Sequence, residues 1–263
     1  MRIKNLEINR NQIAIKSNDL IQRSRFSLTL QQQKIILFLI SKIRQTDEEF
    51  KVYEFDIKKF CEICGIEETN YGNLTYLKDT IKKLSDKSLW IKLENGEETL
   101  LRWIEKPKIS ADRKTIKIKL DEDMKPYLLQ LRERFTKIEL ISTLAMKSAH
   151  SIRLYEYFLS KKNMKVFKVS LDELREITDT KNKYERYIDW KKYVLDKSLD
   201  EIYKYSDIAP FYKPLKYGKK VYGFEIEIIE NEMINWQDNA NARIDKVYAI
   251  RREYRWKDKN ITQ

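Results

Sequence analysis

The sequence of 263 residues is poor in the residue types that build many sites: it has one histidine, two cysteines, five glycines and four prolines. One histidine excludes metal sites with two histidine ligands, including zinc proteases and the DNA-nicking enzymes that hold a metal with a His-hydrophobic-His motif. Two cysteines cannot form a disulfide framework, so we expect a reducing cytoplasm. So few glycines and prolines favour helices with a few tight turns over a many-turned β-sandwich.

Long apolar runs are also absent. The longest compact one, residues 35–40, is far shorter than the roughly 20 residues that cross a bilayer. The N-terminus alternates charged and apolar residues and lacks the apolar core of a secretory signal. We therefore expect neither a membrane span nor export.

Charge and apolar residues are both plentiful. The chain is 42% hydrophobic and 36% charged, with a formal net charge of +12. That much apolar material supports a folded core and excludes disorder as the main state. The excess of cations makes a polyanion such as nucleic acid the natural partner.

The apolar spacing of the first half predicts three helices followed by a hairpin, which is the order of a winged helix. Thr29 and Gln32 form a capping-box pattern at the start of the first helix, and Asn95-Gly96 supplies the tight turn of the hairpin. The predicted elements are a helix over 30–43, a strand over 51–55, helices over 57–64 and 71–85, hairpin strands over 88–93 and 99–104, a strand over 115–120, and a helix from Asp121 through Leu131.

The same order recurs in the second half. We predict helices over 147–161, 170–177 and 187–205, a strand over 166–169, and a hairpin over 211–229. The fold class is therefore α+β, with two tandem winged-helix domains of repeated topology. We expect an N-terminal domain over 1–133, a linker at Arg132–Thr136, and a C-terminal domain over 134–263 that includes a basic tail from about residue 230.

Three motifs allow a catalytic or metal-binding reading beside a structural one. Asp121-Glu122-Asp123 is the densest acidic cluster, but it falls where a helix starts and where acids favour the helix dipole, so capping is preferred over a metal site. Cys61 and Cys64 lack further soft ligands and are interpreted as small core hydrophobes rather than a zinc or redox half-site.

The third motif is His150-Ser151-Ile152-Arg153, which matches the His-x-x-Arg box of tyrosine recombinases, with Tyr184 and Tyr187 downstream as candidate nucleophiles. The box is short and no second histidine exists. A pair on the helix surface, with Arg153 directed to solvent or DNA, is the preferred interpretation. The chain also lacks a Gly-x-x-x-x-Gly-Lys-Ser/Thr loop and a Gly-x-Gly-x-x-Gly turn. No motif in the sequence therefore indicates nucleotide hydrolysis or dinucleotide binding.

Basic residues gather where a winged helix meets DNA. Between residues 181 and 220 there are eleven cations and six acids. If Val194, Leu195, Ser198, Leu199 and Ile202 face the core, a helical wheel directs another set of side chains outward or toward phosphate. The DNA-contacting residues predicted in this module, including its hairpin turn, are Arg186, Asp189, Lys191, Lys192, Tyr193, Lys216, Lys219 and Lys220.

The helix over 71–85 in the first module has a more mixed outer face. The stripe of Leu74, Leu77, Ile81 and Leu84 leaves Lys82 and Lys83 outward, as a second DNA contact or a protein interface. A basic solvated surface without a partner is the alternative for all these cations. The arginines of the tail, Arg251, Arg252 and Arg255, are interpreted as a phosphate-binding arm.

The segments 28–37, 148–157 and 189–202 resemble the iteron-binding plasmid replication initiators of the RepB-like family, and the order of segments extends the likeness over residues 17–229. The resemblance implies two winged-helix domains that bind directly repeated origin sites as monomers and an operator as dimers. It implies a main recognition helix in the second domain, a dimer interface in the first, and a host initiator protein and the replicative helicase as partners. Where relatives place consecutive arginines, this chain has Lys191 and Lys192.

The sequence thus predicts a non-enzymatic plasmid replication initiator that binds double-stranded DNA, needs no cofactor or metal, represses its own gene and exchanges between monomer and homodimer. A transcription regulator without a replication role, and a tyrosine-recombinase-like strand-transfer enzyme, are the alternatives.

Overall fold

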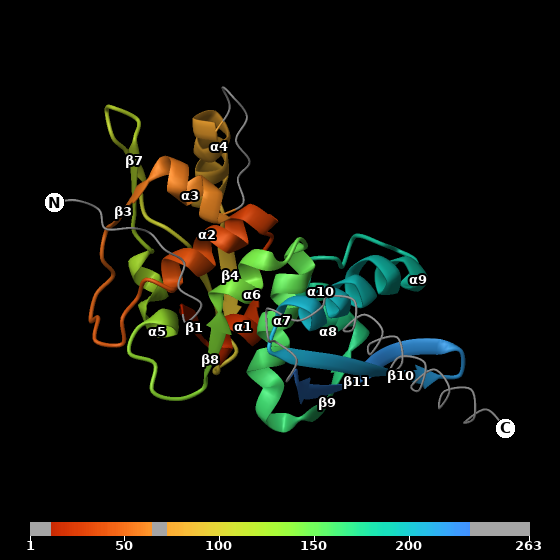
Figure 1. Cartoon of the computed structure of the whole chain (residues 1–263). Coiled ribbons are helices and arrows are strands. Elements are labelled where there is room, and N and C mark those ends of the chain that lie inside the picture. Colours follow the sequence, from red (N-terminus) through yellow and green to blue (C-terminus); the bar gives the residue numbers. More distant parts are fainter. Residues whose placement is uncertain (1–11, 65–72, 232–263) are drawn as a thin grey trace.

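A computed structural model describes residues 12–64 and 73–231 (Figure 1). The helices are α1 (Asn18–Arg23), α2 (Leu30–Ile40), α3 (Ile57–Cys64), α4 (Asn73–Ser85), α5 (Lys125–Leu128), α6 (Leu140–Ala145), α7 (Ala149–Lys161), α8 (Leu171–Ile177), α9 (Tyr187–Trp190) and α10 (Lys197–Tyr205), with 3₁₀ turns at Glu122–Met124 and Lys162–Met164 and a π-helical segment at Lys191–Asp196. The strands are β1 (Ile13–Ser17), β2 (Ser24–Arg25), β3 (Tyr53–Asp56), β4 (Ser88–Lys92), β5 (Glu98–Arg102), β6 (Lys108–Ile109), β7 (Thr115–Ile118), β8 (Phe135–Glu139), β9 (Val166–Ser170), β10 (Ile208–Tyr217) and β11 (Lys220–Glu230).

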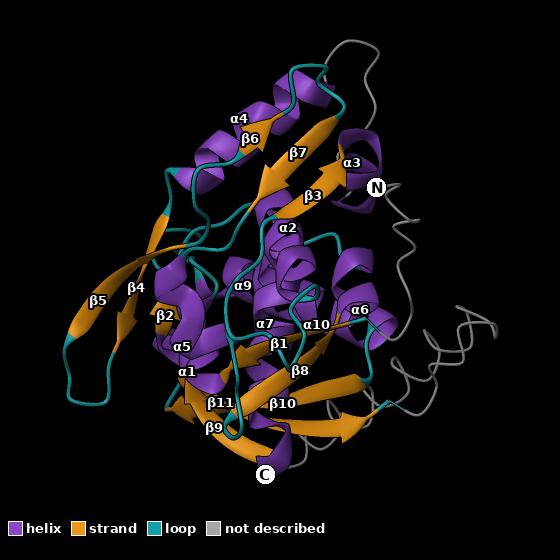
Figure 2. Ribbon diagram, turned by 90° about the vertical axis from the view of Figure 1, so that its left-hand side faces the viewer, coloured by secondary structure: helices purple, strands orange, loops and turns teal. Residues whose placement is uncertain are grey.

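The first module has the winged-helix order α2, α3, α4 and the β4–β5 hairpin. The predicted capping box is confirmed, since the Thr29 hydroxyl accepts the backbone N–H of Gln32 and the Gln32 side chain accepts the N–H of Thr29. Gly96 has a φ of +91° in the hairpin turn, where a side chain would be strained. Strands β3, β7 and β6 form a second antiparallel sheet against these helices (Figure 2).

The second module repeats the order with α7, α8, the helix from α9 to α10, and the β10–β11 hairpin, so two tandem winged helices are confirmed. Strand β9 adds to the hairpin through antiparallel pairing with β11. Gly223 allows that approach, because a Cβ there would lie 2.6 Å from the carbonyl oxygen of Val169. Both modules share one hydrophobic core that includes Trp103 and Trp190.

Sequence reasoning did not foresee β1, α1, β2 and β6 in the first half of the chain, or β8 and α6 at and after the expected linker. Phe135 and Thr136 are part of β8, which pairs antiparallel with β1, so these two residues belong to a sheet rather than to a free linker. The domain boundary between residues 133 and 134 stays a prediction.

Two helix predictions are wrong in their bounds, and the first of these is the helix predicted over 30–43, which ends at Ile40. The helix after Asp121 is a 3₁₀ turn followed by α5, which ends at Leu128 and leaves Leu131 outside. The helix predicted over 187–205 is confirmed, and it contains the six-residue π-helical segment. The start of the helix predicted over 71–85 and the arginines of the tail lie outside the described residues. No helix of the described residues is long and apolar enough to cross a membrane.

A buried ionic network ties the modules together. Glu156 on α7 accepts from the Lys16 ammonium of β1 at 2.6 Å and from the Arg153 guanidinium at 3.1 Å, and all three side chains are at most 4% exposed. Arg153 also donates to the carbonyl oxygens of Ile177 and Ile21. The prediction that Arg153 lies on the surface is therefore wrong: its guanidinium is a buried structural group.

Candidate nucleic-acid interface

The buried side of the second module's long helix, from α9 to α10, agrees with the helical wheel. Val194, Leu195, Ser198, Leu199 and Ile202 are all buried, as predicted. Trp190 is buried beside them, and its indole N–H donates to the Thr180 hydroxyl at 2.8 Å. These contacts fix the rotation of the helix, so its outer face is held in one orientation.

Three of the predicted DNA-contacting residues of this helix are exposed. Arg186 is the residue that precedes α9, and Lys192 and Tyr193 lie on the outer side of the π-helical segment. The Tyr193 ring stacks on Tyr184 with 6.2 Å between centroids and remains 49% exposed. The Lys192 ammonium lies 5.0 Å from the centre of the Tyr193 ring. A cation beside an exposed aromatic ring suits a phosphate and the edge or methyl group of a base.

The other two predicted residues of the helix hold internal ion pairs. Arg186 Nε lies 3.5 Å from the Asp189 carboxylate. Lys191 was expected to reach toward phosphate, but its ammonium lies 2.7 Å from Asp196, which also accepts a hydrogen bond from the Tyr212 hydroxyl. Asp189 and Lys191 are both half-buried. Arg186, although exposed, therefore first has to break an ion pair to contact DNA, as do the half-buried Asp189 and Lys191.

The β10–β11 hairpin carries the remaining cations of the second module at its turn. Lys216, Lys219 and Lys220 are exposed there, and Gly218 adopts a φ of +56° between them. Tyr217, which sequence reasoning did not select, is 87% exposed in the same turn. Its position in the sequence between the predicted DNA contacts Lys216 and Lys219 could have indicated it as a further contact. A basic turn with an exposed aromatic ring is suited to contact phosphates beside a groove.

Helix α4 of the first module is the equivalent of the long helix. Of the predicted stripe, Leu77, Ile81 and Leu84 are buried and Leu74 is half-buried against the core, and Lys82 and Lys83 are exposed as predicted. Each lysine has an acid four residues away: Lys82 lies 3.6 Å from Asp86, and Lys83 lies 2.7 Å from Asp79. The face is therefore more mixed in charge than that of the second module.

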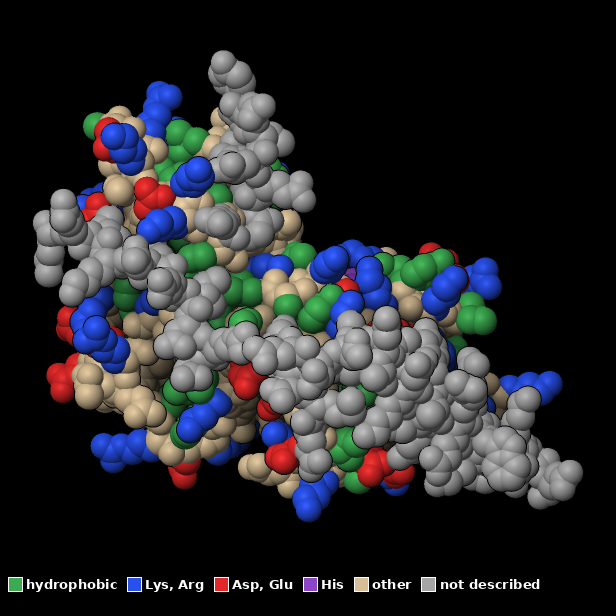
Figure 3. Space-filling model, viewed as in Figure 1, with side chains coloured by type: hydrophobic (Ala, Val, Ile, Leu, Met, Phe, Trp, Pro, Cys, Tyr) green, Lys and Arg blue, Asp and Glu red, His purple; other side chains and the backbone are tan. Residues whose placement is uncertain are grey.

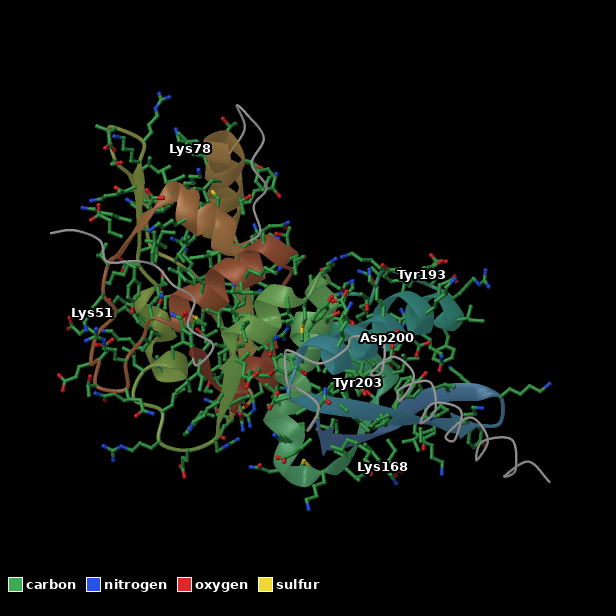
Figure 4. The ribbon with its side chains drawn as sticks, in the orientation of Figure 1. Lys51, Lys78, Lys168, Tyr193, Asp200 and Tyr203 are labelled. Carbon is green, nitrogen blue, oxygen red and sulfur yellow. The ribbon has the colours of Figure 1, made fainter. Side chains whose placement is uncertain are left out.

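One labelled side chain on each long helix lies in the upper part of the molecule as viewed in Figure 4. Figure 4 shows Lys78, on α4, and Tyr193 on the upper side, and Lys168, on β9, on the lower side.

The residues of the recombinase-like box do not form an open site. His150 Nδ1 lies 3.0 Å from the carbonyl oxygen of Thr178, and burial lowers the pKa of the imidazole. The Arg153 guanidinium is occupied by Glu156 and two carbonyl oxygens, so it has no free edge for a scissile phosphate. Tyr184 and Tyr187 are half-buried and packed on other rings.

The remaining chemical motifs have structural roles. The Asp121 side chain caps the 3₁₀ turn by accepting the N–H of Asp123, while Glu122 pairs with Lys119 and Lys125. Cys61 and Cys64 are buried in the core, and burial raises the pKa of the Cys64 thiol. Among the described residues, no group of three or more histidine, cysteine or acidic side chains is placed to hold a metal.

Family models match most of the chain. A model described as "Initiator Replication protein, WH1" matches residues 13–159, and one described as "Initiator Rep protein, WH2" matches residues 170–228. The second range contains the helix from α9 to α10 and nearly all of the β10–β11 hairpin.

Proposed function

Because this chain belongs to the family of initiator replication proteins, which are plasmid replication initiators with two DNA-binding winged-helix domains, we propose that it binds directly repeated double-stranded sites at a plasmid origin and starts replication there. The observation that supports this most is the open face of Arg186, Lys192 and Tyr193. That face lies on a helix whose other side is fixed in the core by Trp190 and its neighbours.

The proposed mechanism is non-catalytic and needs no cofactor. The two modules bind successive major grooves on one face of the duplex, and binding energy is used to distort the DNA. The protein–DNA complex then recruits the host initiator protein and the replicative helicase in the bacterial cytoplasm. A homodimer, in exchange with the monomer, binds an operator and represses the protein's own gene.

The side chains of the open face suit specific readout. Arg186 presents a guanidinium fork that matches the two acceptors of guanine once it leaves Asp189. Lys192 is a point charge and reads guanine less selectively, so part of its role is phosphate contact. The Asp189 carboxylate, released from Arg186, accepts from the amino group of cytosine. The wing lysines Lys216, Lys219 and Lys220 and the α4 lysines Lys82 and Lys83 contact phosphates.

The decisive measurement is a binding titration of the purified protein with a duplex that carries the direct repeats beside its gene, at several salt concentrations. A scrambled duplex of the same length and composition is the control. We expect tighter binding to the repeat, with affinity that falls steeply as salt rises. Equal affinity for both duplexes would contradict sequence-specific recognition.

Single variants locate the recognition face. Replacing Arg186 or Lys192 by Ala is expected to cost about 1–3 kcal/mol on the repeat and less on the scrambled duplex. Lys168→Ala is the matched control, because Lys168 is an exposed lysine on the opposite side of the second module (Figure 4). If the Arg186 and Lys192 variants bind the repeat like the control, these residues do not form the recognition face.

Two further tests separate this function from its alternatives. A transcription regulator would bind DNA equally well, so a plasmid that carries only the repeats and the origin is tested for replication with the protein supplied separately. Failure to replicate, with binding intact, would favour the regulator. A strand-transfer enzyme would leave a covalent protein–DNA adduct on supercoiled origin DNA, and we expect none.

A further inference from the structure

A cluster of cations lies where the two modules meet, apart from the recognition face. We call it the inter-module cluster and define it by Lys83, Lys87, His150, Lys183 and Lys197. Lys87, just after α4, interacts electrostatically with Lys83 of its own module and with Lys183 of the other. His150, in the first turn of α7, interacts with the same Lys183 and with Lys197 at the start of α10. Figure 3 shows the histidine among Lys and Arg side chains in the hollow between the two arms of the molecule.

Acids offset part of this cluster, since the Lys83 ammonium lies 2.7 Å from the Asp79 carboxylate. Asp179 is the acid that faces both Lys87 and His150, and its carboxylate lies 3.1 Å from the Lys183 ammonium. The Lys87 ammonium is held by neutral acceptors, the carbonyl oxygen of Ser27 and the side-chain oxygen of Gln32. Within the described part of the chain, neither Lys87 nor Lys197 has a carboxylate at ion-pair distance. Like charges gathered in a partly desolvated hollow repel each other and are relieved by an anion.

We propose that the inter-module cluster is a binding site for DNA phosphates, which holds the stretch of backbone between the two modules. The site rests on the proposed function, because it uses the duplex that the two recognition helices contact. It is built from both modules, so it exists only when they are placed as in this structure. It reads no bases and therefore strengthens binding to every sequence alike.

His150 gives the site a second property. A carbonyl oxygen only accepts, so Nδ1 carries the proton of the hydrogen bond to Thr178, and Nε2 is the atom that gains a proton. The charged groups around the ring are Asp179 and Lys183 from the loop after α8, and Lys197 from α10. The Glu201 carboxylate on α10 accepts the backbone N–H groups of Lys147 and Ser148 just before it. A phosphate added among these groups favours the imidazolium, so DNA binding takes up a proton at Nε2.

The test measures affinity for the repeat and for a scrambled duplex between pH 5.5 and 8.5 and at several salt concentrations. The variants are Lys183→Gln, Lys197→Gln and His150→Asn, in which the Asn amide keeps a donor for Thr178; Lys168→Gln is the control, and thermal melting confirms that each variant folds. We expect the two lysine variants to weaken binding several-fold on both duplexes and to reduce the steepness of the salt dependence by about one. Because burial lowers the pKa of His150, wild-type affinity is expected to rise as pH falls below about 6.5, and His150→Asn to remove that rise.

The outcomes separate this site from the proposed function. If Lys183→Gln, Lys197→Gln and His150→Asn match Lys168→Gln in affinity, salt dependence and pH profile, while Arg186→Ala still weakens binding to the repeat, the inter-module site is refuted and the function stands. If the wild-type protein binds neither duplex, the proposed function itself fails and the site fails with it.

Discussion

The buried ionic network of Lys16, Arg153 and Glu156, at the boundary between the modules (the seam), leads to the strongest prediction on stability. In a Glu156→Gln variant the carboxylate that accepts from Lys16 at 2.6 Å and from Arg153 at 3.1 Å becomes a neutral amide, and two cations remain in a site that is at most 4% exposed. Removing one partner of a buried ion pair costs about 3–5 kcal/mol, because the remaining charge is uncompensated. For a chain of this length that corresponds to a melting temperature lowered by about 6–20 °C.

Urea denaturation followed by circular dichroism measures this loss, provided that both proteins unfold in one transition. The matched control is Glu54→Gln, which removes a half-exposed carboxylate 3.4 Å from Lys117 and is expected to cost less than about 1 kcal/mol. Lys16→Met should cost less than Glu156→Gln, since Glu156 then keeps Arg153. A Glu156→Gln variant as stable as the Glu54→Gln control would refute the claim that this network holds the seam.

Three other predictions address single sites. Gly223→Ala should destabilise the fold by about 1–3 kcal/mol in urea titration, because the new Cβ would lie 2.6 Å from the Val169 carbonyl oxygen. A variant as stable as the wild type would show that the β9–β11 pairing shifts freely. Burial lowers the pKa of His150, so below about pH 6.5 the unfolded chain binds more protons than the folded protein does. The stability of the protein should therefore fall as pH drops through that region. Melting curves at several pH values should show this slope for the wild type and not for His150→Asn. Because burial raises the pKa of the Cys64 thiol, a thiol reagent should label it only in denaturant, and rapid labelling of the native protein would show that the core opens.

The regular elements of both modules were predictable because their apolar residues repeat at helical or strand spacing. The stripe Leu77, Ile81 and Leu84 and the pair Leu199 and Ile202 are buried as the spacing indicates. Strand β1 was missed because Lys16 interrupts its apolar pattern. That lysine is buried only because Glu156, 140 residues later, accepts its charge. A pattern within a short window carries no information on such a distant partner.

The candidate interface, like the regular elements, was predictable from the sequence only in part. A wheel of regular α-helix selects Lys192 and Tyr193 as outward, and they are exposed, but it does not reveal that Lys191 is paired with Asp196. The wheel also does not reveal the π-helical segment that follows Trp190, although it directs Val194 and Leu195 to the core, where both are buried. The inter-module cluster was not predictable, because Lys87 and Lys183 meet only through the packing of two modules.

The seam and the DNA-binding surfaces are energetically connected. When both modules contact one duplex, the second contact is intramolecular, and its strength depends on how rigidly the first presents it. The Glu156 network joins β1 to α7, and the ion pair of Arg25 and Glu176 at 3.2 Å joins β2 to α8, so both connect the two modules that carry α4 and the helix from α9 to α10. Glu156→Gln is therefore expected to weaken binding to the full repeat more than binding to a shortened duplex that one module occupies. Simple loss of folded protein would reduce both alike, so the ratio of the two affinities measures the coupling through the seam.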